Sequence, residues 1–237
     1  MSVRKRLVII VPAHNESRTI GTILNKLSVL PDAGMDRDVI VVDDGSTDGT
    51  AEIAANFASG RSGWQVLRHA RNQGKGAAVR TALAAATGDA VIIQDADLEY
   101  DPADIPKLER AYLESGGSAA IFGSRNLHKN DYAHFSYYLG GRLITLFGNL
   151  LYGLKLTDIF TGYKLVPMDR MRQIGLGAVG FEFCPEVTAK LTRLGVAIRE
   201  IPIGYHARTF AEGKQIRARD GWISLKTLVR YRFWRPR

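Results

Sequence analysis

Short hydrophobic runs alternate with periodic apolar stripes in the first part of the chain. Runs rich in Val and Ile predict strands buried on both faces, and they cover residues 7–13, 38–43, 65–67 and 90–94. Between the first two runs, apolar residues recur at helical spacing, at Ile20, Ile23, Leu24 and Leu27. Strands that alternate with helices predict an α/β fold with a mostly parallel central sheet flanked by helices.

The rest of the chain has a less regular pattern. We expect helices near residues 104–114, 135–152, 185–194 and 221–233, and strands near residues 119–122, 163–166 and 197–203. No linker, low-complexity tract or long internal repeat interrupts the chain. We therefore expect residues 1–237 to form a single domain with two halves, residues 1–101 and residues 102–237.

The composition narrows the class of protein. The 237 residues are 46% hydrophobic and 24% charged, which excludes a disordered chain, a collagen-like repeat and a polytopic membrane protein. Lys and Arg total 32 against 24 Asp and Glu, a net charge of +8 that indicates a polyanionic partner. Anionic lipid and phosphorylated substrates fit, whereas no recognisable nucleic-acid-binding module is present. Cys184 is the only cysteine, which favours a cytoplasmic location, and we expect it to be a small core residue.

Two segments bear on contact with a membrane. The longest uncharged stretch, residues 143–154, is shorter than the roughly 20 apolar residues that span a bilayer. The segment from Gly221 to Phe233 has an apolar stripe beside a basic stripe and predicts a basic amphipathic helix. This helix and the one near residues 135–152 either lie at a lipid surface or turn their apolar stripes to the core. Any membrane contact is therefore expected to be peripheral.

The strongest candidate for chemistry is the acidic segment that follows the fourth predicted strand. In extended backbone, Asp95, Asp97 and Glu99 would point to one side and converge. Three converging carboxylates need a cation between them, and Mg²⁺ or Mn²⁺ prefers oxygen ligands and leaves positions for a diphosphate. The alternative is a solvated acidic turn ahead of a helix, with Asp101 or Asp104 as its cap.

Polar residues also follow the other predicted strands. Asp43 and Asp44 could accept hydrogen bonds from a nucleobase and a ribose, or could serve only as turn and helix caps. Asn15 and Glu16 leave the same alternatives open. Lys75 lies between two glycines that could cradle a phosphate at a helix N-terminus, although the segment is neither a Walker A nor a Gly-x-Gly-x-x-Gly sequence.

Taken in order, these segments resemble the family 2 GT-A glycosyltransferases, and more narrowly the polyprenyl-phosphate sugar synthases, such as dolichyl-phosphate mannose and glucose synthases. The similarity spans residues 6 to 233. The matching segments are residues 11–16, 42–50, 74–76, 94–100, 123–125, 157–158, 161–164, 180–183, Arg208 and 212–214. Two departures concern residues 211–214, where many relatives have Gly-x-Ser-Lys, and Thr161-Gly162, where others have Ser-Gly or Thr-Cys.

The resemblance implies a GT-A (Rossmann-like) fold in which the two halves of the chain bind different substrates. Residues 1–101 would bind a nucleotide-sugar donor, and residues 102–237 would bind the acceptor and end in the basic amphipathic helix. The donor site would comprise Pro12, Ala13, Asn15, Glu16, Asp43, Asp44, Lys75, Asp95, Ala96 and Asp97. Asp95, Asp97 and Glu99 would hold Mg²⁺ or Mn²⁺.

The resemblance also implies basic residues that meet the acceptor phosphate. These are Arg125, Arg142, Arg208 and Lys214. Asp97, Arg125 and Lys214 are the expected catalytic residues. An anionic phosphate needs cations to position it rather than a strong base, whereas a hydroxyl acceptor would need a carboxylate base. Asp158 is the candidate for that base, with a cap of a helix or turn as its alternative role.

The resulting expectation is an inverting, metal-dependent hexosyltransferase. It would move a hexose from a nucleotide sugar, of the GDP-mannose or UDP-glucose type, to a polyprenyl phosphate at the cytosolic face of a membrane, with which it would associate peripherally. Two alternatives remain open. One is a family 2 enzyme with a hydroxyl acceptor, and the other is a non-catalytic nucleotide-sugar-binding subunit that recruits a membrane-protein partner.

Overall fold

The described strands form one mixed sheet. The computed structural model describes residues 3–128, 130, 135–180, 182–207 and 218–236. The strands are β1 (Arg6–Ala13), β2 (Asp36–Asp43), β3 (Trp64–Arg68), β4 (Ala90–Ile93), β5 (Ala120–Ser124), β6 (Lys164–Pro167) and β7 (Ile198–Pro202). Their order is β3-β2-β1-β4-β6-β5-β7. All neighbours are parallel except β6, which runs antiparallel to both β4 and β5. The predicted mostly parallel α/β sheet is confirmed.

Strand β1 is an uninterrupted hydrophobic run because both of its faces are buried. Leu7, Ile9 and Val11 contribute to the core on one face of the sheet, and the alternating residues Val8 and Ile10 contribute to the core on the other. All five side chains are fully buried. A strand in the middle of a sheet that is covered on both faces has no solvated side.

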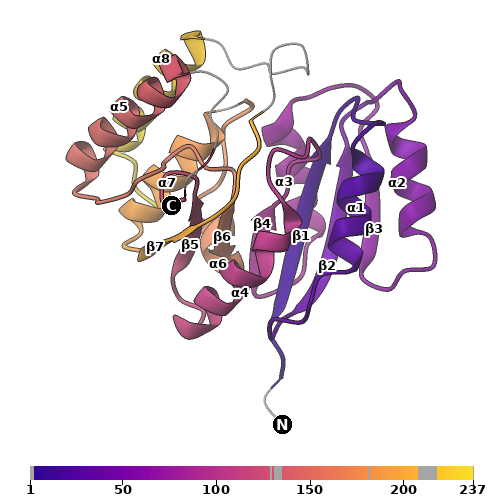
Figure 1. Ribbon diagram of the computed structural model, residues 1–237. Coiled ribbons are helices and arrows are strands. Elements are labelled where there is room, and N and C mark those ends of the chain that lie inside the picture. Colours follow the sequence, from indigo (N-terminus) through magenta and orange to yellow (C-terminus); the bar gives the residue numbers. More distant parts are fainter. Residues whose placement is uncertain (1–2, 129, 131–134, 181, 208–217, 237) are drawn as a thin grey trace.

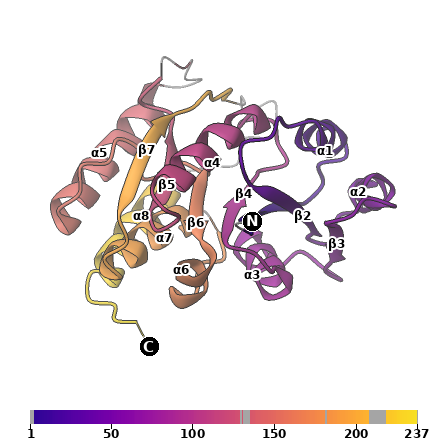
Figure 2. The ribbon, with the colours of Figure 1, turned by 90° about the horizontal axis from the view of Figure 1, so that it is seen from below.

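Helices cover both faces, as Figure 2 shows. The helices are α1 (Ile20–Ser28), α2 (Thr50–Ala58), α3 (Lys75–Ala85), the 3₁₀ turn η1 (Pro102–Asp104), α4 (Ile105–Glu114), α5 (Phe135–Tyr152), α6 (Met168–Gln173), α7 (Phe183–Arg193) and α8 (Ala218–Tyr231). Helices α1, α2 and α4 pack into one core, and α3, α6 and α7 into the other. The short helix α6 was not predicted.

Helices α5 and α8 pack against each other at the end of the molecule farthest from β3 (Figure 1). A Cβ placed on Gly148 of α5 would lie 3.5 Å from the side chain of Leu228 in α8, so the two helices approach closely there. The Tyr152 hydroxyl also donates to the Leu228 carbonyl at 2.6 Å. Among the described residues, no helix is long and apolar enough to cross a membrane.

The register of the strands gathers their polar ends at one edge. Ala13 of β1 is paired with Asp43 of β2, and the Asp44 N–H donates to the Ala13 carbonyl at 2.8 Å. On the other side of β1, the Gln94 N–H donates to the Ile10 carbonyl at 2.8 Å. The segments that leave β1, β2 and β4 therefore lie side by side, at the edge where open α/β sheets bind ligands.

Candidate functional site

A cavity of about 370 Å³ lies at this edge of the sheet, and both halves of the chain line it. The expected site residues that line the cavity are Pro12, Ala13, Glu16, Asp44, Lys75, Asp95, Ala96, Asp97, Glu99 and Arg125. Asp97 and Arg125, expected to be catalytic, thus face the same space although they come from different halves. Asn15 and Asp43 are not among the described residues that line it. Arg208 and Lys214 fall outside the described residues.

Asn15 ties together the segments that follow β1 and β2. Its backbone N–H donates to Ser46 Oγ at 2.9 Å, and its side-chain Oδ1 accepts from the Thr47 N–H at 3.0 Å. Asn15 has a φ of 54°, a left-handed conformation that asparagine tolerates better than most residues. Asn15 therefore joins the segments after β1 and β2, several of whose residues line the cavity.

Asp44 fixes the loop that precedes α3. Its Oδ1 accepts from the Gln73 N–H at 2.9 Å and lies 2.7 Å from His69 Nδ1, while its Oδ2 accepts from the Gly74 N–H at 2.8 Å. Gly74 has a φ of 91°, and a Cβ there would lie 2.9 Å from the Val179 carbonyl. The buried Asp44 carboxylate therefore holds the glycine loop beside the cavity, in addition to lining it.

Asp43 has a different environment. The side chain is fully buried, and its Oδ2 lies 3.3 Å from both Arg68 Nε and the Ser46 N–H. Its Oδ1 is buried and has no hydrogen-bond partner in the described part of the chain. A buried acceptor without a donor is costly, so this oxygen is suited to accept from a ligand or a trapped water.

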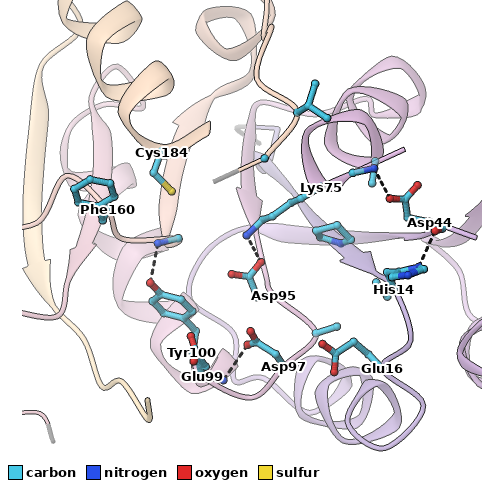
Figure 3. Close-up of a pocket in the computed structure, with 18 of the residues that line it drawn as sticks. His14, Glu16, Asp44, Lys75, Asp95, Asp97, Glu99, Tyr100, Phe160 and Cys184 are labelled. Atoms are coloured by element: carbon cyan, nitrogen blue, oxygen red, sulfur yellow. Dashed lines mark hydrogen bonds and ion pairs between the residues drawn. The ribbon is translucent and has the colours of Figure 1, made fainter. Parts of the chain in front are cut away.

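Lys75 and Asp95 form an ion pair inside the cavity. The Lys75 ammonium donates to Asp95 Oδ1 at 2.5 Å, and Figure 3 shows the lysine reaching across from the start of α3. Burial alone would lower the pKa of Lys75, but attraction to Asp95 outweighs it and the pKa is raised. Lys75 therefore stays charged and can face a diphosphate beside Asp95.

The acidic segment does not continue as a strand. Strand β4 ends at Ile93, and Leu98 has a φ of 63°, so the extended geometry expected for Asp95, Asp97 and Glu99 is wrong. The chain turns instead, and Asp97 Oδ1 accepts from the Glu99 N–H at 3.1 Å. Glu99 Oε2 accepts from the Tyr205 hydroxyl at 2.8 Å. Spacing alone could not show this turn, because it depends on Leu98 in a left-handed conformation.

Two of the three expected metal ligands still fit a divalent cation. Asp95 and Asp97 both line the cavity, and Figure 3 shows their carboxyl groups on the same side of it. Mg²⁺ is commonly held by one or two carboxylates together with substrate phosphates and water. No group of three His, Cys, Asp or Glu side chains in the described ranges is arranged to hold a metal. Hard oxygen donors from Asp95 and Asp97 suit Mg²⁺ or Mn²⁺.

Arg125, which also lines the cavity, is paired with Asp158. Arg125 Nε and one terminal nitrogen donate to the two carboxylate oxygens at 2.7 and 2.8 Å. Burial would raise the pKa of Asp158, but the Arg125 guanidinium outweighs it and the pKa is lowered. Asp158 also accepts from the Phe160 N–H at 3.2 Å, so it caps a turn as well as orienting Arg125. An ionised carboxylate held by arginine is a weak base.

Several other residues differ from the sequence-based expectations in their position relative to the cavity. Arg142 is exposed on α5 and is not among the described residues that line the cavity. Cys184 is half-buried: it packs against one core cluster, as expected, and it also lines the cavity. Tyr100, Phe160 and Tyr205 also line it, although no sequence signal separated them from other aromatic residues.

Known proteins share both the sequence pattern and the fold. The model of glycosyl transferase family 2 matches residues 8–174. An undecaprenyl-phosphate mannosyltransferase of Micrococcus luteus is 31% identical to this chain, and the alignment covers 88% of this chain and 87% of the mannosyltransferase. A dolichol-phosphate mannosyltransferase of Pyrococcus furiosus is 27% identical, and the alignment covers 88% of this chain and 59% of that enzyme.

Solved structures extend the likeness to the GT-A fold. A Mycobacterium tuberculosis glucosyl-3-phosphoglycerate synthase in complex with Mn²⁺, uridine diphosphate and phosphoglyceric acid superposes with a TM-score of 0.69. The two chains are 23% identical, and the alignment covers 97% of this chain and 79% of that one. At this identity, the likeness shows the fold.

Proposed function

The chain belongs to family 2 of the glycosyl transferases, and we propose that it transfers a hexose from a nucleotide sugar to a polyprenyl phosphate. The observation that carries this proposal is a single cavity in which Asp95 and Asp97 face Arg125. Such a cavity offers carboxylates for a metal-bound diphosphate and a cation for a second phosphate. Two relatives named as mannosyltransferases of undecaprenyl and dolichol phosphate support the acceptor class.

The donor side would bind a nucleotide sugar of the GDP-mannose or UDP-glucose type. Asp95 and Asp97 would hold Mg²⁺ or Mn²⁺, which when bound would neutralise charge that develops on the departing diphosphate. Lys75 adds a protein cation beside the same group. The segments 12–16 and 43–44 would enclose the nucleoside, with Asn15 and Asp44 holding their backbone in place.

The acceptor side would orient a phosphate that is already anionic. One oxygen of the polyprenyl phosphate attacks the anomeric carbon while the bond from that carbon to the donor's diphosphate oxygen breaks. The electron pair of that bond leaves with the nucleoside diphosphate, and attack from the opposite face inverts the anomeric centre. Arg125, oriented by Asp158, would hold the attacking phosphate, and Arg208 and Lys214 are proposed to assist.

A hydroxyl acceptor is the second candidate. The structural likeness to a glucosyl-3-phosphoglycerate synthase favours it, because that enzyme is crystallised with phosphoglyceric acid. Such a reaction needs a carboxylate base near the acceptor. Asp158 is poorly suited to that role because both of its oxygens are bound by Arg125 and its pKa is lowered.

A non-catalytic subunit that recruits a membrane-protein partner would need only to bind the donor. It would not need a cation for a second phosphate in the same cavity as Asp95 and Asp97. The presence of the Arg125 and Asp158 pair therefore favours an enzyme.

The proposed acceptor would bring the protein to the cytosolic face of a membrane. Helices α5 and α8 turn large apolar side chains to solvent, namely Leu139, Leu143, Leu146, Phe147, Leu150, Trp222, Ile223 and Val229. Exposed basic residues lie among them, at Arg142, Lys226 and Arg230. Apolar side chains interspersed with cations suit the surface of an anionic bilayer.

The test is transfer of labelled sugar from a panel of GDP- and UDP-sugars to a short-chain polyprenyl phosphate. The reaction is run with Mg²⁺, with Mn²⁺, with a chelator and with the Asp97→Ala variant. Label in the lipid that requires both the metal and Asp97 supports the proposal and identifies the donor. If the protein binds a nucleotide sugar and labels a hydroxyl compound but no lipid phosphate, the second candidate replaces the first.

A further inference from the structure

Tyr205 lies between the two sides of the cavity. It follows β7, its side chain is only 5% exposed, and it lines the cavity. Its hydroxyl donates to Glu99 Oε2 at 2.8 Å. On the acceptor side, the Arg125 guanidinium lies 4.9 Å from the centre of the Tyr205 ring. One side chain therefore contacts both the acidic segment of the donor half and the buried cation of the acceptor half.

The backbone around Tyr205 is tied to the same two residues. The His206 N–H donates to the Glu99 carbonyl at 2.9 Å. The Tyr205 N–H donates to Asn130 Oδ1 at 3.0 Å, and Asn130 Nδ2 donates to the Arg125 carbonyl at 2.7 Å. The segment is thus fixed to Glu99 and, through Asn130, to Arg125, independently of the tyrosine side chain.

The tyrosine ring is held in a fixed orientation. It packs at a tilt against the Tyr100 ring, with centroids 5.3 Å apart, and Tyr100 in turn stacks on Tyr163 at 4.8 Å. These aromatic contacts direct the Tyr205 hydroxyl toward Glu99, to which it donates.

We propose that Tyr205 is a positioning residue that sets the acidic donor segment and the acceptor cation relative to each other. The hydroxyl acts on the donor side, because it holds Glu99, whose backbone N–H bonds to Asp97. The ring acts on the acceptor side, because it packs against Arg125. This inference rests on the proposed function, since it assigns a role within the same transfer reaction.

The two parts of the side chain can be separated with two variants of the full chain. Tyr205→Phe removes only the hydroxyl, and Tyr205→Leu removes the hydroxyl and the ring. Calorimetry measures the affinity for GDP and UDP in the presence of Mg²⁺, and the transfer assay gives KM for donor and acceptor. Tyr112→Phe is the matched control, because it removes a buried hydroxyl that donates to the Asp89 carbonyl and does not line the cavity.

We expect Tyr205→Phe to weaken nucleotide binding with Mg²⁺ by about fivefold and to leave KM for the acceptor unchanged, since only a hydrogen bond to a charged group is lost. Tyr205→Leu should additionally raise KM for the acceptor by about tenfold, because Arg125 loses its aromatic support. Tyr112→Phe should change neither value. A loss of thermal stability shared by all three variants would not separate the effect on nucleotide affinity from the effect on KM for the acceptor.

A double-mutant cycle tests whether Tyr205 acts through Glu99. In a Glu99→Ala background, which has no side-chain acceptor for the Tyr205 hydroxyl, the Tyr205→Phe substitution should have no further effect on nucleotide affinity. Additive effects, or a Tyr205→Phe variant that matches the wild type in every measurement, would overturn the inference and leave the proposed function intact. If the wild type neither binds nucleotide nor transfers sugar, the proposed function itself fails. If the Tyr205→Leu variant does not fold, the double-mutant cycle still shows whether Tyr205 acts through Glu99.

Discussion

The two halves of the chain meet at one cavity but hold their polar groups there in different ways. In the first half, Asp44 and Asp95 lie just beyond β2 and β4, the two strands that pair in parallel with β1 on either side. In the second half, Arg125 also follows a strand, β5, but its side chain is held by the paired Asp158 carboxylate and the Tyr205 ring. The first arrangement depends on the sheet, whereas the second depends on a few long-range side-chain contacts. Substitutions in the two halves should therefore fail in different ways.

The largest expected effect is on the donor side. Asp97→Asn should lower the transfer rate by a factor of about 10² to 10³, because it removes a proposed ligand of the divalent cation that would neutralise the departing diphosphate. The variant should keep its thermal stability, since Asp97 lies on a turn beyond the sheet. Steady-state kinetics with Mg²⁺ and a melting curve measure both. A variant as active as the wild type would remove Asp97 from the donor site.

In the second half of the chain, the Asp158→Asn substitution should lower the stability of the fold. Asp158→Asn leaves the Arg125 guanidinium, whose side chain is 20% exposed, without its counter-charge, and the loss of charge-assisted hydrogen bonds should destabilise the protein by about 2 kcal/mol. Denaturant unfolding measures this change. Equal stability of the wild type and the variant would mean that the pair does not hold the acceptor half together.

The stability that Asp158 contributes should also depend on pH. Its folded-state pKa lies below the ordinary value of 3.8, so the contribution is fully present above pH 3.8 and is lost as the pH falls through the lower folded-state value. Melting curves of the wild type and of Asp158→Asn should therefore converge only under strongly acidic conditions. A gap that closes near neutral pH would contradict this account of the pair.

Arg125→Lys tests whether geometry matters as well as charge. A lysine keeps the positive charge but cannot make the bidentate contact with Asp158, so KM for the acceptor phosphate should rise by about tenfold. KM for the nucleotide sugar should not change. A matching rise in both values would mean that Arg125 serves the donor, and the division between the halves would be lost.

The smallest effect concerns the outer surface of the acceptor half. Arg230→Ala should weaken binding to vesicles that contain anionic lipid by about fivefold, which corresponds to about 1 kcal/mol for one basic residue near the surface. Arg61→Ala, an exposed arginine of the donor half, is the control and should bind like the wild type. Sedimentation with the vesicles gives both values. Equal losses in the two variants would argue against α5 and α8 as the membrane-facing surface.

The hydrophobic pattern was enough to predict the first half of the fold. The run from Val8 to Val11 could be placed only in a strand covered on both faces, and the helical stripe from Ile20 to Leu27 follows it directly. The antiparallel direction of β6 could not be predicted, because the short segment Lys164–Pro167 pairs with strands that are distant in sequence. The same is true of α6, which has only six residues.

The site was predictable where it depends on strand ends and not where it depends on distant contacts. The motifs placed Asp95 and Asp97 at the cavity, but the left-handed Leu98 and the bond from Tyr205 to Glu99 join positions that no local pattern connects. Asp44 was expected near the nucleobase, which stays a prediction, and its bonds to the Gln73 and Gly74 backbone show a structural role. Arg208 and Lys214 stay predictions.

The central claim is that the first half binds the donor and the second half binds the acceptor. The most direct test is calorimetric titration of GDP and UDP, with and without Mg²⁺, into the wild type, Asp97→Asn and Arg125→Lys. The account predicts that one nucleotide binds the wild type more tightly with Mg²⁺, that Asp97→Asn loses this Mg²⁺-dependent gain, and that Arg125→Lys retains it. Loss of the gain in Arg125→Lys, or its persistence in Asp97→Asn, would contradict the claim.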